Sequence, residues 1–277
     1  MSPLPDLGDP FETPEEAITE YDAAGHTVLR GLATGEEIAA YRPGLLRAAP
    51  KGRYDHRPLE ARDTYGQAFI QMFNLWTHDE DARAFVFARR FASVAAALLG
   101  VDAVRLYHDQ ALFKEPGGGA TPWHQDQFYW PLDTDRTITM WMPLVDVTNE
   151  MGVMEFASGS HRQGHLGEYA IGDESEAVFQ RMVEERALQV EGPGALRAGD
   201  ATFHSGWTLH RAPGNSSGQM REVMTVIYFA DGTRVGPLDH ESRRFDRNVW
   251  LPGCEPGEPA ASRLNPVLYA GDSRDAG

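Results

Sequence analysis

The chain is poor in cysteine and in positive charge. Its 277 residues include a single cysteine, Cys254. This excludes an internal disulfide framework and suits a reducing cytoplasm. Lysine and arginine together number 25 against 41 aspartates and glutamates, which gives a net charge of -16. A surface of that sign disfavours nucleic acid and anionic membranes as partners.

Long hydrophobic runs are absent as well. No apolar stretch approaches the roughly 20 residues that cross a bilayer. Residues 1–20 are acidic and proline-rich, without the basic and apolar segments of a secretory signal. We therefore expect a cytoplasmic protein. The 42% hydrophobic content, with 28 glycines and 18 prolines, fits one large β-rich domain over residues 1–277 better than two small ones.

The first third of the chain predicts helices. Residues 13–24 begin with a cap, a proline and two glutamates, and Gly25 follows them. Residues 34–48 read as a second helix, and residues 79–99 keep helical spacing up to a glycine. Residues 26–32 are β-prone, and residues 50–66 have no clear period and are predicted to form a loop. We expect the helices of this region, about 13–100, to cover one face of a sheet.

Short strands separated by turn residues are predicted from residue 102 onward. The strongest candidate is 137–147, and residues 173–186 read as an acidic helical or loop insertion. The other candidates are 104–114, 152–156, 187–191, 199–203, 208–212 and 221–230. This pattern is typical of a jelly roll or sandwich-like barrel, here a core of about 102–231. The tail, 232–277, is predicted to wrap the surface.

His124 and Asp126 are the first candidates for a chemical role. On an extended segment, side chains two residues apart point to the same side. One imidazole nitrogen and one carboxylate oxygen could then bind a single metal ion. A second histidine from a distant strand would complete the 2-His-1-carboxylate set of non-haem Fe(II) oxygenases. Alone, the pair is a weak signal that is also found in surface turns.

The second half of the chain offers that histidine twice. His204 and His210 have the same parity on an ideal strand, but only His210 is followed, eleven residues later, by an arginine, Arg221. Arginine supplies the planar fork that a cosubstrate carboxylate needs. A hairpin turn over residues 214–218 would place His210 and Arg221 on neighbouring strands. We therefore prefer His210 as the ligand, with His204 as the alternative.

These features together resemble the phytanoyl-CoA dioxygenase family of Fe(II)- and 2-oxoglutarate-dependent oxygenases. The matching motifs lie within residues 104–230: His124-Gln-Asp126, Gly159-Ser160-His161, Gly199-Asp200, His210 with Asn215 and Ser216, and Arg221. The resemblance implies a mainly β fold with flanking α-helices and a double-stranded β-helix (jelly-roll, cupin-like) core. It implies that His124, Asp126 and His210 bind Fe(II), that Arg221 binds the distal carboxylate of 2-oxoglutarate, and that O2 is consumed. It further implies that Gln110, Thr139 and Trp141 line the 2-oxoglutarate pocket.

One position departs from the family pattern. The family often has a serine two residues after the distal histidine, whereas this chain has Ala212. The expected reaction is hydroxylation of a small molecule, with succinate and CO2 as products. The acidic charge makes a CoA thioester a less natural substrate than a free small molecule or secondary metabolite. Halogenation is disfavoured because Asp126 occupies the position that related halogenases leave to chloride. Neither the substrate nor the oligomeric state can be read from the sequence.

Other interpretations remain open at this stage. A cupin-like protein that binds a metal or sugar without oxygen chemistry would use the same three ligands but would have no use for Arg221. Single residues also have structural interpretations. We expect His161 in a turn and His108 in the core or along a cavity. The aromatic residues Phe128, Tyr129 and Trp130 either fill the core or line a substrate site.

Overall fold

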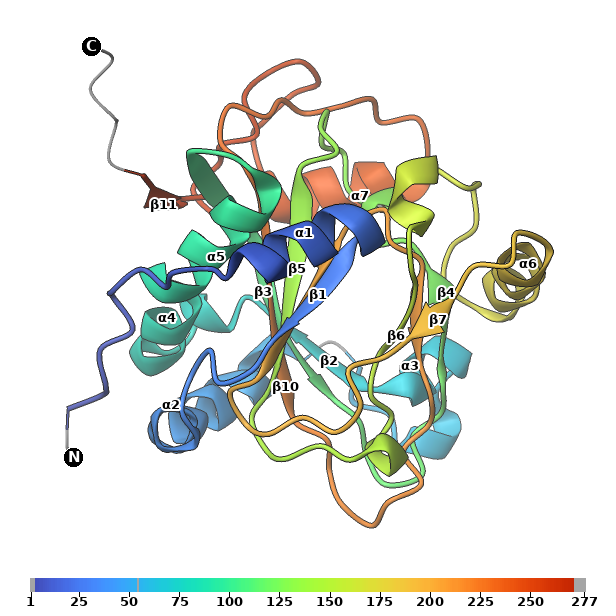
Figure 1. Ribbon diagram of the computed structural model, residues 1–277, viewed down its shortest axis with the longest axis horizontal. Helices are drawn as coiled ribbons and strands as arrows, with labels where there is room; N and C mark the ends of the chain where they lie inside the picture. Colours follow the sequence, from blue (N-terminus) through green and yellow to red (C-terminus); the bar gives the residue numbers. More distant parts are fainter. Residues whose placement is uncertain (1–2, 54, 272–277) are drawn as a thin grey trace.

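The computed structural model describes residues 3–53 and 55–271, and within them the strands form two antiparallel sheets that face each other (Figure 1). The seven-stranded sheet has the order β1-β8-β5-β10-β3-β11, and β2 also pairs with β3. The four-stranded sheet has the order β4-β9-β6-β7. The strands are β1 (His26–Leu29), β2 (Ile70–Phe73), β3 (Ala103–Phe113), β4 (Thr121–His124), β5 (Thr137–Pro143), β6 (Glu155–Ala157), β7 (Val190–Glu191), β8 (Ala201–Ser205), β9 (His210–Ala212), β10 (Val223–Ala230) and β11 (Val267–Ala270).

Helices cover the outer faces of both sheets. In Figure 1, α1, α2, α4 and α5 lie beside the large sheet, α6 lies outside the small sheet near β4, and α7 lies at one end of the sandwich. The α-helices are α1 (Glu15–Ala24), α2 (Gly35–Ala48), α3 (Thr64–Ala68), α4 (Glu80–Val86), α5 (Arg89–Leu99), α6 (Asp173–Glu185) and α7 (Glu241–Trp250). Short 3-10 turns are η1 (Ala49–Gly52), η2 (Leu59–Ala61), η3 (Leu75–Thr77), η4 (Asp126–Phe128), η5 (Asn149–Met151) and η6 (Ser160–Gln163). Among the described helices, none combines the length and the apolar character needed to cross a membrane.

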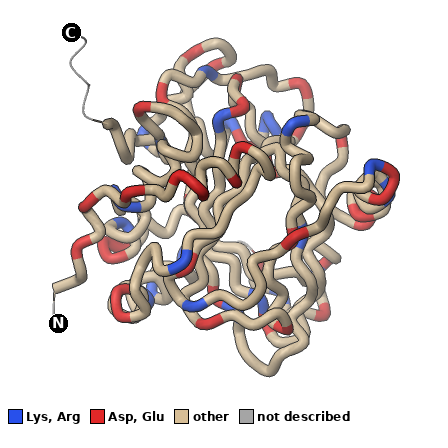
Figure 2. Tube along the Cα trace, in the orientation of Figure 1, with Lys and Arg blue, Asp and Glu red and all other residues tan. Residues whose placement is uncertain are grey.

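The large sheet is buried on both of its faces. One face packs against α1 and α5, and the other looks toward the small sheet. Every residue of β5 and β10 is therefore buried, which explains why these strands read as continuous apolar runs rather than alternating ones. Figure 2 shows the charged residues gathered on outer helices and loops, with acidic residues in the majority. The predicted jelly-roll fold with flanking helices is confirmed.

Three local predictions were wrong. The predicted loop at 50–66 contains short 3-10 turns and the start of α3, whose cap Asp63 accepts a hydrogen bond from the backbone of Gly66. The predicted helix over 79–99 is two helices, because Ala88 is extended, with ψ 113°. The predicted surface tail contains α7 and β11, and β11 adds to the edge of the large sheet. Helix α7 is polar on average but strongly amphipathic, so a helical pattern was present in the predicted tail and was overlooked.

The predicted hairpin between His210 and Arg221 was also wrong. His210 opens β9, which pairs with β4 and β6 in the small sheet. Arg221 precedes β10 of the large sheet and pairs with Lys114 through backbone hydrogen bonds. The connection therefore passes from one sheet to the other. As a result, the two side chains approach the space between the sheets from opposite walls.

Candidate metal centre

The end of β4 positions His124 and Asp126. The strand ends at His124, and η4 begins at Asp126. The residue between them, Gln125, is extended at φ -117° and ψ 124°, so the alternation of side chains continues past the end of the strand. Its side-chain amide donates hydrogen bonds to the carbonyls of Trp207 (2.6 Å) and Gly164 (2.8 Å). These contacts fix the turn and hold both side chains on one side.

His210 completes a cluster of three ligand groups. It lies directly opposite His124 in the pairing of β4 with β9. Asp126 Oδ1 lies 3.5 Å from Nε2 of His124 and 3.7 Å from Nε2 of His210. One ligand atom from each of the three residues lies within 4.8 Å of the others. This spacing suits a single ion held on one face by two imidazoles and a carboxylate.

Backbone carbonyls orient both imidazole rings. Nδ1 of His124 lies 2.8 Å from the carbonyl oxygen of Pro122, and Nδ1 of His210 lies 2.9 Å from that of Thr208. In each ring Nδ1 therefore donates to a carbonyl, which leaves the Nε2 lone pair facing Asp126. A hydrogen bond of this kind usually fixes the tautomer of a metal-binding histidine.

The charge state of the cluster suits a cation. Burial and the imidazole of His124 lower the pKa of His210 well below its ordinary value, so the ring is neutral. For Asp126, burial alone would raise the pKa. The surrounding imidazoles of His210, His124 and His204 outweigh that effect and hold the pKa well below its usual range. A neutral His210 imidazole and an ionised Asp126 carboxylate are the protonation states that metal binding requires of these two groups.

His204 and Thr139 contact the same carboxylate from the large sheet. Thr139 donates a hydrogen bond to Asp126 Oδ2 at 3.0 Å, and Nε2 of His204 lies 3.3 Å from that oxygen. Oδ1, the oxygen that faces His124 and His210, is thereby left free. The preferred ligand, His210, and the alternative, His204, therefore occupy different places. His210 faces His124 across the cluster, and His204 contacts Oδ2 of Asp126, the oxygen that does not face these two rings.

A small cavity of about 70 Å³ lies between the sheets beside the cluster. All of the residues that the sequence proposed for metal and cosubstrate line it, although they come from strands of both sheets. They are Gln110, His124, Asp126, Thr139, Trp141, His210 and Arg221. Ala212, the departure from the family pattern, lines it too, and Thr121 lies opposite Ala212 in the pairing of β4 with β9.

Arg221 is a buried cation without a carboxylate partner among the described residues. Only 1% of the residue is exposed. One terminal nitrogen donates to the carbonyl of Gly152, the guanidinium lies 5.4 Å from the ring centre of Trp141, and Nε has no hydrogen-bond partner. Burial lowers its pKa to about 9, so the group stays cationic at neutral pH. An unpaired buried cation is costly, and an anion in the cavity would offset that cost.

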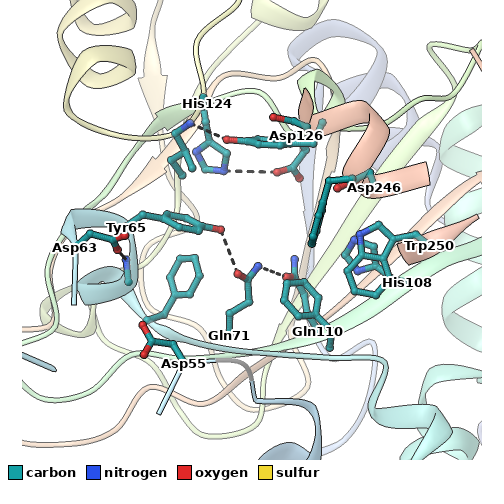
Figure 3. A pocket seen from close by; sticks show the side chains of 18 of the residues that line it. Asp55, Asp63, Tyr65, Gln71, His108, Gln110, His124, Asp126, Asp246 and Trp250 are labelled. Carbon is teal, nitrogen blue, oxygen red and sulfur yellow. Dashed lines mark hydrogen bonds and ion pairs between the residues drawn. The ribbon is translucent and has the colours of Figure 1, made fainter. Parts of the chain in front are cut away.

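A second cavity, of about 740 Å³, adjoins the cluster (Figure 3). His124 and Asp126 line both cavities. A chain of side chains also borders both: Tyr65 donates to Gln71 at 3.5 Å, and Gln71 donates to Gln110 at 2.6 Å. Figure 3 shows this chain below His124 and Asp126, with Asp246, Trp250 and His108 at the far side.

The arrangement fits an iron ion and a keto diacid. His124, Asp126 and His210 offer three ligand atoms and leave further coordination positions open toward the cavities. Arg221 lines the small cavity and has an Nε without a hydrogen-bond partner, which an anionic group could use. An aliphatic diacid with one end on the metal and the other on Arg221 would satisfy both.

Several residues of the site were missed by the sequence. Tyr65 and Gln71 come from the region read as a loop and the short strand after it, and Asp246 and Trp250 come from the predicted tail. Tyr65 and Gln71 lie in segments without a clear period or motif, whereas Asp246 and Trp250 lie in α7, whose amphipathic pattern was a usable signal. Tyr129 and Trp130, by contrast, do line the large cavity, and His108 lines it as one of its expected alternatives. His161 lies in η6, in agreement with the expected turn.

A comparison with protein-family models identifies the family of this chain. Residues 21–223 match the model described as Phytanoyl-CoA dioxygenase (PhyH). The chain belongs to the phytanoyl-CoA dioxygenase family. This match covers most of the chain and confirms the resemblance that the motifs carried. The three residues of the His-Asp-His cluster all lie within the matched range.

Curated relatives are similar to the chain over part of their length. The chain is 30% identical over 165 residues to a methylphosphonate hydroxylase of Gimesia maris, covering 58% of this chain and 59% of the relative. It is 28% identical over 131 residues to a probable alpha-ketoglutarate-dependent hypophosphite dioxygenase of Stutzerimonas stutzeri, covering 46% of each. The chain thus spans only about half of the curated relatives it matches.

Solved structures with this fold match over nearly the whole chain. The carbocyclase SnoK from nogalamycin biosynthesis has a TM-score of 0.76 at 24% identity, covering 94% of this chain and 99% of SnoK. The epimerase SnoN, in complex with Fe3+, alpha ketoglutarate and nogalamycin RO, has a TM-score of 0.73 at 26% identity, covering 92% and 98%. The shared architecture therefore extends beyond the metal-binding core to the flanking helices.

Proposed function

We propose that this chain is a dioxygenase that couples decarboxylation of 2-oxoglutarate to hydroxylation of a C–H bond in a sizeable small-molecule substrate. The observation that carries the proposal is that His124 and Asp126 line both a small and a large cavity. The small cavity leads to Arg221 and suits the cosubstrate. The large one suits the substrate. An oxidation that joins two reactants at one metal needs this arrangement.

In this proposal His124, Asp126 and His210 hold Fe(II), and Arg221 holds the distal carboxylate of 2-oxoglutarate. Bound iron supplies the oxygen activation and the oxidising power. Thr139 and His204 keep Asp126 oriented, while Gln110 and Trp141 form walls of the cosubstrate cavity. Thr121 lies opposite Ala212 and brings a hydroxyl to the same cavity. It takes the part of the serine that many family members carry at the position of Ala212.

The size and charge of the large cavity favour a bulky substrate over a small oxyanion. A volume of about 740 Å³ lies in the upper part of the range usual for ligand pockets. Its two arginines are already paired, Arg57 with Asp55 at 2.7 Å and Arg62 with Glu115 at 2.6 Å. No guanidinium among the described lining residues is left for a phosphonate. The substrates named for the Gimesia and Stutzerimonas relatives therefore suit this cavity poorly.

The test of the oxygenase assignment is anaerobic spectroscopy. Adding Fe(II) and 2-oxoglutarate should produce a weak charge-transfer band near ~500 nm, as expected when a keto acid chelates iron through two oxygens. The same protein with Fe(II) and succinate serves as the control, since succinate has no keto group. A protein that binds iron stoichiometrically but forms no band with 2-oxoglutarate would contradict the proposal.

A substrate screen scored by succinate release tests the size argument. Methylphosphonate and hypophosphite should stimulate succinate release less than polycyclic or glycosylated compounds do. Stimulation by methylphosphonate as strong as by any large compound would show that the substrate is a small oxyanion. The oxygenase assignment would stand in that case, because it depends on the charge-transfer band.

A further inference from the structure

Helix α7 contributes one face to the large cavity. Its lining residues follow the spacing of a single helical face: Glu241, Ser242, Phe245, Asp246 and Trp250. Phe245 is 57% exposed, an unusual degree for a phenylalanine. An exposed aromatic side chain beside a cavity is a surface that a ligand can cover. The helix therefore carries contacts that neither the metal nor the cosubstrate uses.

Asp246 is a buried carboxyl group that no cation neutralises. It is 7% exposed, accepts a hydrogen bond from the Tyr107 hydroxyl at 2.9 Å, and is also hydrogen-bonded by the Trp250 side chain. Both donors are neutral. None of the ion pairs formed by the described residues includes Asp246, and burial raises its pKa to about 7. A cation in the cavity would relieve the cost of ionising this group.

His108 lies beside it on the same wall. Its ring centre is 4.7 Å from that of Trp250, only 5% of the residue is exposed, and Nδ1 has no hydrogen-bond partner. Burial lowers the pKa of His108 to about 4, so the imidazole is neutral at ordinary pH. A neutral imidazole can offer one ring nitrogen as a hydrogen-bond acceptor. This polar group, too, is not used by the metal cluster.

The surroundings of Asp246 and His108 are aromatic and acidic. Trp130, Tyr129, Phe73 and Trp250 line the same cavity. Aromatic faces attract cations, and the attraction is stronger where water is excluded. The cavity as a whole is lined by five carboxylates, those of Asp55, Asp63, Asp126, Glu241 and Asp246, against two guanidinium groups, those of Arg57 and Arg62. Arg57 pairs with Asp55, Arg62 pairs with Glu115, and Asp126 belongs to the metal cluster, so Asp63, Glu241 and Asp246 are the acids without an ion pair among the described residues.

We propose that the substrate carries a protonated amine and that Asp246 binds it, with His108 and the aromatic wall completing the ammonium site. This inference rests on the proposed function, because it takes the large cavity to be the substrate cavity. It names a substrate class, amine-bearing ring compounds, and a specificity-determining residue. A neutral hydroxyl or amide at the same place would gain the hydrogen bonds but not the charge pair.

The test compares amines with their uncharged counterparts. Naphthylmethylamine and aminomethylanthracene, each beside its N-acetyl derivative, are titrated anaerobically into the protein loaded with Fe(II) and 2-oxoglutarate. Binding is followed by the change in the charge-transfer band and by calorimetry. We expect each amine to bind wild type at least tenfold more tightly than its amide. Equal binding of amine and amide, or binding of neither, would overturn the inference.

Two variants locate the effect. Asp246→Asn keeps an acceptor for Tyr107 but removes the charge, so amine binding should weaken at least tenfold while amide binding changes little. Glu241→Gln removes the same charge from an exposed position on the same helix face, and there we expect less than a threefold change. An unchanged ratio of amine to amide affinity in Asp246→Asn would remove Asp246 from the site.

The readouts separate this inference from the proposed function. The charge-transfer band and its 2-oxoglutarate titration should be the same in wild type and Asp246→Asn, because Asp246 contacts neither cosubstrate nor metal ligands in this proposal. A normal band without amine preference would overturn only the substrate class. Loss of the band in wild type itself would overturn the proposed function.

Discussion

Asp126 divides its two carboxylate oxygens between different partners. Oδ1 faces His124 and His210, whereas Oδ2 contacts Thr139 and His204. Oδ1 is therefore the oxygen available to the metal, and Thr139 and His204 orient the carboxylate through Oδ2. Residues that orient a ligand usually change metal affinity by about 10–100-fold when they are removed. The two histidines should therefore respond differently to substitution.

We expect His210→Ala to purify without iron, because one of only three protein ligands is lost. His204→Ala should still bind one iron when Fe(II) is in excess, with an affinity reduced by about 10–100-fold. Iron content and an anaerobic Fe(II) titration measure both. If His204→Ala lost the metal and His210→Ala kept it, the assignment of the ligand would be reversed.

Arg221→Lys tests whether the arginine binds the cosubstrate. Lysine keeps the charge but loses the planar fork, so 2-oxoglutarate binding should weaken by about 1.5–3 kcal/mol, roughly tenfold to hundredfold. Arg42→Lys is the matched control, since Arg42 makes a two-point contact with Glu222, next in sequence to Arg221. Titrating the charge-transfer band with 2-oxoglutarate gives both constants. Equal constants in wild type and Arg221→Lys would exclude the arginine from the site.

Much of the metal centre was predictable from residue types and spacing. His124, Asp126 and Arg221 are weak signals singly, but their order and spacing together are specific, and the structure brings them to one cavity. The choice between His204 and His210 was harder. Both are buried and both approach Asp126. What distinguishes them is that the chain crosses from the large sheet to the small sheet between His204 and His210.

Among the structural elements, the turn after η5 connects the backbone directly to the cosubstrate site. Gly152 ends this turn with φ +78°, and its carbonyl accepts a hydrogen bond from Arg221. A Cβ atom at this position would lie 2.2 Å from the carbonyl oxygen of Pro213. The turn, β9 and Arg221 therefore depend on one another for their positions.

Gly152→Ala should destabilise the fold by about 2–4 kcal/mol, because the left-handed backbone and the contact with Pro213 both oppose a side chain. It should also weaken 2-oxoglutarate binding by displacing the carbonyl that holds Arg221. Gly232→Ala is the control: its φ is +85°, but a Cβ there meets nothing within 4 Å, so only about 1–2 kcal/mol is expected. Denaturant unfolding compares the two, and equal losses would show that the close approach has no effect.

Elements were predictable where one pattern dominated. Strands β5 and β10 are buried on both faces and stand out as apolar runs. Helix α2 begins with a capping box between Thr34 and Glu37 that the sequence displays openly. Helix α7 was missed although it is strongly amphipathic, because it is polar on average and lies between Gly- and Pro-bearing segments. That the chain forms a single domain remains a prediction.

At the scale of the whole molecule, one buried acid links stability to pH. Asp109 in β3 is fully buried and accepts a hydrogen bond from the backbone of Leu75 at 2.8 Å. Burial raises its pKa from 3.8 to about 7. The folded state then holds a proton that the unfolded state has released. This contribution to stability is complete below about pH 4 and is lost as pH rises to about 7.

Asp109→Asn removes that dependence, because the amide does not titrate. The free energy of unfolding of the variant, relative to wild type, should therefore rise by roughly 2–4 kcal/mol between about pH 4 and pH 8. Denaturant titrations at several pH values measure this difference, in which the contributions of the buried histidines cancel. A difference that stays constant with pH would mean that Asp109 is ionised in the folded protein at all of these values.

The strand order of the large sheet delays the pairing of β1 while the chain is being synthesised at the ribosome. Strand β1 has β8 as its neighbour in the large sheet, and the partner of His26 is His204, roughly 180 positions later in the chain. At about 5–20 residues per second, His26–Leu29 waits roughly 10–40 s for its partner strand to be made. During that interval the apolar side chains of β1 have no sheet to join. Heterologous production should therefore benefit from slower growth at low temperature or from added chaperones that hold the unfinished chain.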